Sequence, residues 1–179
     1  MQISSTIPFS DWTPLNDTIM GGASQSNCEP LSNGLLLKGF LIEENGGFVS
    51  CRSPVLEPPL DLSPFKGIEV KIDGYGRTLK FAISCKTQFM NFMPDFYDRI
   101  KWVAEFKTQK NGTSIIRLPF EKFQPTIRTR PVTSNMDFRV NHVNQFQLLY
   151  SKFGMAGKAN ESFLQGPIQI LLRCLSAYI

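Results

Sequence analysis

Histidine is nearly absent from this sequence, since His142 is the only one among 179 residues. A Ser/His/Asp or Cys/His catalytic arrangement would have to be built on that side chain. Its neighbours, residues 140–144, are typical of a polar strand end or loop. No C-x-x-C pair offers zinc-ligand spacing, and no glycine-rich phosphate-binding motif is found. We therefore predict no catalytic residue, no metal and no cofactor.

Long apolar runs and a basic leader are missing as well. No window approaches the ~18 consecutive apolar residues of a membrane span, so none is predicted. Residues 1–9 have neither the basic nor the apolar region of a secretory signal. We therefore expect a cytoplasmic protein, in which the cysteines remain reduced thiols. They are Cys28, Cys51, Cys85 and Cys174.

Amphipathic helices are the third absence. No stretch of ~10 residues or more has convincing helical periodicity. Instead, short runs rich in Phe and β-branched residues alternate with turn residues, and the twelve prolines lie mostly between runs. This pattern predicts one all-β domain over residues 1–179, folded as a two-sheet sandwich. The clearest predicted strands are 35–42, 48–53, 67–73, 79–85, 101–107, 114–119, 146–150 and 167–175.

Two pairs of runs have the pattern of a hairpin. Residues 67–73 and 79–85 alternate apolar and polar side chains on both sides of the turn residues 74–76. Residues 101–107 and 114–119 flank Asn111-Gly112, the dipeptide best suited to a type I′ turn. We therefore predict two hairpins.

The net charge of +4 is too small to indicate nucleic acid, but the charges are unevenly distributed. Residues 1–65 carry two basic and seven acidic side chains, whereas Lys122, Arg128, Arg130 and Arg139 face only Asp137 within 122–139. Two interpretations stay open. These are either ordinary solvated strand faces or oppositely charged regions that lie side by side.

Several segments resemble one family. Residues 12–24 carry a Trp, then Asn-Asp, then Met-Gly-Gly-x-Ser, and residues 46–53 carry Gly-Gly-Phe followed by Ser and Arg. Residues 61–68 read Asp-Leu-Ser … Gly-Ile, and residues 118–130 read Leu-Pro-Phe … Phe-x-Pro … Arg-x-Arg. In this order, and with a closing strand from Gly166, they resemble the complex I intermediate-associated protein 30 family over about residues 9–179.

The resemblance implies a galactose-binding-like jelly roll, similar in outline to carbohydrate-binding modules. It also implies a chaperone-like role in assembling respiratory complex I or, as in photosynthetic relatives, a photosystem. The expected partners are protein subunits of such a complex, and whether a small ligand also binds stays open. The candidate contact residues are Trp12, Asn16, Asp17, Arg52, Phe92, Met93, Arg128 and Arg130.

Each candidate also has a structural interpretation. The two Gly-Gly pairs, 21–22 and 46–47, suit positive φ or close backbone approach, and Asp17 and Asp61 suit turn capping. The three arginines would form either internal ion pairs with the acidic first third or contacts with a partner's carboxylates or phosphates. The cluster 89–97, rich in Phe and Met, either closes the core or grips another chain.

The sequence thus favours a non-catalytic protein-binding assembly factor. One alternative is a carbohydrate-binding module, in which Trp12, Trp102 and Tyr150 would stack on a sugar ring. Another is an RNA-binding factor in photosystem biogenesis that uses the basic segment 122–139.

Overall fold

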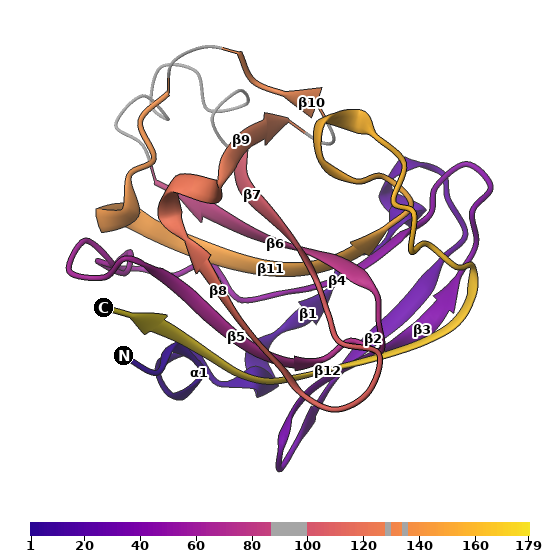
Figure 1. The fold of residues 1–179 in the computed structure, drawn as a ribbon, viewed down its shortest axis with the longest axis horizontal. Coiled ribbons are helices and arrows are strands. Elements are labelled where there is room, and N and C mark those ends of the chain that lie inside the picture. The colour runs from indigo at the N-terminus through magenta and orange to yellow at the C-terminus, as the bar shows by residue number, and fades with distance from the viewer. Residues whose placement is uncertain (87–99, 128–129, 134–135) are drawn as a thin grey trace.

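Two antiparallel sheets packed face to face make up this computed structural model, which describes residues 1–86, 100–127, 130–133 and 136–179 (Figure 1). The larger sheet contains, in spatial order, β1 (Thr13–Pro14), β4 (Phe48–Arg52), β11 (Val143–Ser151), β6 (Thr78–Cys85), β7 (Ile100–Lys107), β9 (Gln124–Ile127) and β10 (Arg130–Pro131). The smaller contains β2 (Gln25–Leu31), β3 (Gly34–Leu41), β12 (Gly166–Tyr178), β5 (Gly67–Asp73) and β8 (Ser114–Pro119). The predicted all-β two-sheet sandwich is confirmed.

Helices are short wherever the structure describes the chain. The one α-helix of the described ranges, α1 (Ile3–Thr6), packs on β12 (Figure 1), and Met1 exchanges backbone hydrogen bonds with Ala177. Short 3-10 turns link the strands. They are η1 (Phe9–Asp11), η2 (Asp17–Met20), η4 (Phe120–Lys122), η5 (Val140–His142) and η6 (Met155–Gly157). None of these elements has the length and apolar character that a membrane-spanning helix requires.

The core lies between the sheets and follows the predicted alternation. Ile68, Val70 and Ile72 of β5 are fully buried, as are Leu79 and Phe81 of β6. All eight predicted strands form, with ends within a few residues of the predicted ones. The short strands β1, β9 and β10 and the longer β2 were not predicted, because polar residues and prolines interrupt their patterns.

Neither predicted hairpin forms. β5 pairs with β12 and β8 in the smaller sheet, whereas β6 pairs with β11 and β7 in the larger one. The turn residues 74–77 therefore carry the chain from one sheet to the other. The connection through Asn111-Gly112 does the same between β7 and β8, and of the two only Gly112 has a positive φ. A type I′ turn needs positive φ at both central residues, so that prediction is wrong.

The prediction of four reduced thiols is also wrong. Cys28 of β2 and Cys51 of β4 form a disulfide that joins the two sheets, with Cα atoms 5.9 Å apart. Cys85 and Cys174 are free. Cys28 and Cys51 are only 7% and 0% exposed, so the packed core shields the bond from external thiols.

Candidate ligand-binding groove

The motif around Asp17 builds a rigid corner at one end of the larger sheet. The Asp17 side chain is fully buried, and its Oδ1 accepts a hydrogen bond from the Ser24 amide at 2.9 Å. Its Oδ2 accepts from the Ser24 hydroxyl at 2.6 Å and from the amides of Gly47 and Phe48 at 2.6 and 3.2 Å. Burial raises the pKa of the Asp17 carboxyl, but these hydrogen bonds outweigh burial and hold the pKa below its usual value.

Both Gly-Gly pairs serve this corner. Gly21 and Gly47 have φ of +87° and +101°, a region that favours glycine. Gly22 and Gly46 press against the Asp17 side chain so closely that a Cβ atom on either would overlap the carboxyl group. The sequence suggested positive φ or close backbone approach as reasons for these glycines. In each pair, one glycine has the positive φ and the other has the close approach. Asp17 acts as a positioning residue that ties η2 to the start of β4.

Beside this corner, the outer face of the larger sheet is hollowed into a cavity of about 740 Å³. Alternate side chains of the central strands form its floor, among them Gln147 and Leu149 of β11, Lys80 and Ala82 of β6, and Val103 of β7. Its walls come from η2, the end of β9, β10 and the 153–156 segment, and β10 and η6 lie side by side (Figure 1).

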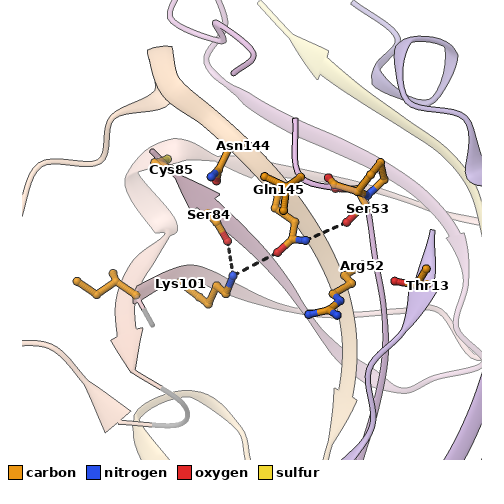
Figure 2. A pocket seen from close by; sticks show the side chains of 11 residues that line it. Thr13, Arg52, Ser53, Ser84, Cys85, Lys101, Asn144 and Gln145 are labelled. Atoms are coloured by element: carbon orange, nitrogen blue, oxygen red, sulfur yellow. Dashed lines mark hydrogen bonds between the residues drawn. The ribbon is translucent and has the colours of Figure 1, made fainter. Parts of the chain in front are cut away.

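A second cavity of about 540 Å³ continues along the same face and shares Lys101 with the first. Figure 2 shows its polar chain of hydrogen bonds: the Lys101 ammonium donates to Ser84 Oγ at 2.5 Å and to Gln145 Oε1 at 3.4 Å. Gln145 Nε2 in turn donates to the backbone oxygen of Ser53 at 3.0 Å. Arg52 also lines this cavity (Figure 2). We call the two cavities together the groove.

The rim of the first cavity carries exposed apolar side chains. Ile19 and Met20 of η2 are 65% and 51% exposed, and Phe153 on the opposite wall is 38% exposed. Because Asp17 begins η2, the buried carboxylate fixes the position of Ile19 and Met20. These apolar side chains give the groove a hydrophobic edge suited to contact with another molecule.

The predicted contact residues are divided between this groove and the interior. Arg52 and Arg130 line the groove. Asn16 is partly buried, and its Oδ1 accepts a hydrogen bond from the Ser26 hydroxyl at 2.6 Å. Trp12 and Asp17 are 4% and 0% exposed, so a direct contact with a partner does not agree with their positions. Phe92, Met93 and Arg128 lie outside the described residues.

The three aromatic rings that were predicted to stack on a sugar are also too buried to do so. Trp12, Trp102 and Tyr150 are each at least nine-tenths buried. Trp102 stacks on Phe138 with ring centroids 4.4 Å apart, and the Tyr150 hydroxyl donates to the backbone oxygen of Ser162. A stacking platform needs an open ring face, and these rings face the core instead.

Several groove residues were missed by the sequence analysis. On β6 the alternation places Leu79, Phe81 and Ile83 on one face and Lys80, Ala82 and Ser84 on the other, and none of these last three was among the predicted contact residues. The pattern identified the face but gave no sign that walls from distant loops enclose it. For Ile19 and Met20 a signal existed, because two large apolar residues stand directly before the first Gly-Gly pair.

Among the described residues, the cysteine and histidine side chains that could act in catalysis do not meet in the groove. Cys85 lines the second cavity, but burial raises the pKa of its thiol to about 12, so it stays protonated. His142 lies in η5 and lines neither cavity. Throughout the described ranges no three His, Cys, Asp or Glu side chains are grouped as metal ligands would be. Asp61 caps its own turn by accepting from the Ser63 amide at 2.9 Å, as expected.

Comparison with known proteins gives one family and one fold. The family model described as Complex I intermediate-associated protein 30 matches residues 1–170. No match is found among curated protein sequences.

Solved structures resemble the fold at low sequence identity. A family 11 carbohydrate-binding module from Clostridium thermocellum, in complex with a β-1,3-1,4-mixed-linked tetrasaccharide, is 13% identical with a TM-score of 0.62, covering 94% of this chain and 88% of that one. The same family's module from the cellulase Lic26A-Cel5E has a TM-score of 0.61 at 13% identity, covering 94% and 87%. The agarase AgWH50C has a TM-score of 0.51 at 10% identity, covering 98% of this chain and 23% of the agarase. The fold is therefore a galactose-binding-like jelly roll, as predicted.

Proposed function

Because this chain belongs to the complex I intermediate-associated protein 30 family, we propose that it is a non-catalytic assembly factor that binds a protein subunit of a membrane-bound energy-converting complex. The groove on the larger sheet is its docking surface. It shields a segment of an unassembled subunit until the next subunit displaces it.

The observation that carries this proposal is the chemistry of the groove lining. Nine of the nineteen residues that line the first cavity have aliphatic or thioether side chains, and the aromatic ones are Phe48 and Phe153. Gln147 and Ser151 add hydrogen-bonding groups between them. Aliphatic contacts with interspersed hydrogen bonds suit a polypeptide, and the rings predicted to stack on a sugar, Trp12, Trp102 and Tyr150, are buried.

We expect the exposed apolar rim to contribute strongly to capture of the partner. In the variant Ile19→Glu/Met20→Glu, two side chains that would be desolvated by the partner become charged. Recovery of complex subunits from the native host under mild conditions should fall about tenfold or more, because burial of each apolar side chain contributes about 1–2 kcal/mol. Quantitative mass spectrometry of the captured proteins measures this change.

Ile115→Glu provides the matched control, since Ile115 is 59% exposed but lies on β8 in the other sheet. This variant should capture the subunits as the unmodified protein does. Recovery of only unrelated proteins by the unmodified chain would overturn the assembly role.

Two rival functions have separate readouts. A glycan array with the unmodified protein tests the carbohydrate-binding alternative, which the likeness in fold alone supports. An RNA interaction through the basic segment 122–139 would weaken steeply as salt is raised. Tight binding in either assay, with no recovery of complex subunits, would replace the proposed function.

A further inference from the structure

The groove is cationic along its whole described length, and this further inference rests on the proposed function. The basic side chains that line the two cavities are Arg52, Lys80, Lys101 and Arg130. Among the described residues no Asp or Glu lines either cavity. A groove with cations and without lining carboxylates favours a ligand of negative charge.

Lys80 is the most deeply buried of these cations. Its side chain lies on the floor of the first cavity, the residue is 8% exposed, and its Nζ donates to the Gly154 backbone oxygen at 3.3 Å. Burial lowers the pKa of the ammonium, and the charge of Glu105 opposes this shift. Glu105 lies opposite Lys80 on β7, but its Oε2 accepts from the Met155 amide and it lines neither cavity.

Arg52 and Arg130 add two guanidinium groups. Neither side chain makes a hydrogen bond or an ion pair with any residue that the structure describes. Arg52 reaches the second cavity from β4, and Arg130 lies on the wall of the first (Figure 2 for Arg52). A guanidinium in a concave site is suited to a carboxylate, which it binds through two parallel hydrogen bonds.

Along the strands, a pair of apolar residues separates one group of cations from the next. Lys80 lies four residues from Ser84 on β6, and Ser84 Oγ accepts from the Lys101 ammonium. Ala82 and Val103 form a directly opposed pair between these positions. Four residues of extended chain span about 13 Å, so a strand-like ligand placed along the groove would meet positive charge at both ends and apolar floor between them.

We propose that the groove binds an extended peptide segment with two acidic side chains about four residues apart and aliphatic residues between them. Lys80 and Arg130 receive one carboxylate in the first cavity, Arg52 receives the other in the second, and the aliphatic side chains lie over Ala82 and Val103. A peptide fits better than an acidic glycan or RNA, because aliphatic side chains lie between the cations and the predicted stacking rings are buried.

Fluorescence anisotropy with a labelled peptide, Gly-Ser-Glu-Val-Leu-Val-Glu-Ser-Gly, tests this proposal. It should bind the full chain about tenfold or more tighter than the same peptide with Gln at both Glu positions, because charge-assisted hydrogen bonds are about twice as strong as neutral ones. Lys80→Met should remove most of this preference. Lys71→Met, on an exposed position of β5 in the other sheet, should leave it unchanged.

Because Lys80 is buried, the exposed wall residue provides a second variant, Arg130→Ser, which should weaken binding of the acidic peptide several-fold without lowering the melting temperature. Equal affinity for the Glu and Gln peptides, or unchanged binding by both variants, would overturn the proposal. So would tighter binding of oligogalacturonate or oligouridylate than of the peptide. If the unmodified protein captures complex subunits and Lys80→Met and Arg130→Ser capture them equally well, the assembly role stands and the acidic-peptide groove is wrong.

Discussion

Asp17→Asn should lower the free energy of unfolding by about 3 kcal/mol, which corresponds to a fall of about 6–12 °C in melting temperature. The buried carboxylate accepts four hydrogen bonds, three of them from backbone amides. An asparagine has only one acceptor oxygen, so its NH₂ group would face amide donors of the 46–48 turn. Thermal and urea unfolding followed by circular dichroism measure the loss.

Asp11→Asn is the matched control, because Asp11 is exposed and its Oδ1 accepts only from the neighbouring Ser10 hydroxyl. We expect it to change the free energy of unfolding by less than about 0.5 kcal/mol. The Asp17 variant should also capture less partner, because Ile19 and Met20 lose their fixed position. Wild-type stability of Asp17→Asn would contradict the structural role given to this carboxylate.

The same carboxylate makes stability dependent on pH in a defined direction. The pKa of Asp17 is lower in the folded chain than in the unfolded one, where it is near ~3.9. Its contribution is therefore complete above the unfolded pKa and is lost as pH falls through the folded pKa. The difference in unfolding free energy between the native protein and Asp17→Asn should narrow below about pH 4. A difference that stays constant between neutral pH and pH 3 would contradict this assignment.

Removing the Cys28–Cys51 bond should lower the free energy of unfolding by about 3 kcal/mol. The two cysteines are 23 residues apart, and closing a loop of that size restricts the unfolded chain by roughly this amount. The double variant Cys28→Ala/Cys51→Ala, compared with the native protein by urea unfolding, measures the effect. Native protein unfolded with and without a reducing agent should show the same difference.

Cys174→Ala serves as the control, since Cys174 is a partly exposed free thiol. It should be nearly neutral. Mass spectrometry after alkylation of unfolded, unreduced protein should find two modified cysteines. If all four cysteines are alkylated, the disulfide does not form and the prediction of four reduced thiols is correct.

The sequence predicts the strands of this fold better than it predicts their partners. The alternation of Ile68, Val70 and Ile72 identifies a half-buried strand, because a period of two depends only on the strand itself. The same alternation and the same turn residues are found in a hairpin and in a connection that crosses from one sheet to the other. Only the packing of distant strands distinguishes the two, so both predicted hairpins failed.

The groove and the disulfide were not predicted, because both depend on contacts between segments that are distant in the sequence. Lys80 has the pattern of a solvated strand residue, but it is buried beside the distant 153–156 segment, where the Gly154 backbone oxygen accepts from its ammonium. Cys28 and Cys51 have no characteristic spacing and meet because β2 and β4 lie on facing sheets. The family motif pointed to Arg52, which lines the groove. It also pointed to Trp12 and Asp17, whose place in the motif reflects architecture rather than contact.

The position of β12 affects how the protein is made. This strand occupies the centre of the smaller sheet, between β3 and β5, yet it is encoded after every other strand. During translation, the edges of β3 and β5 that pair with β12 therefore stay unpaired until Gly166–Tyr178 has left the ribosome. Such edges favour pairing with other chains, so expression at reduced temperature or with a holdase chaperone should raise the yield of native protein.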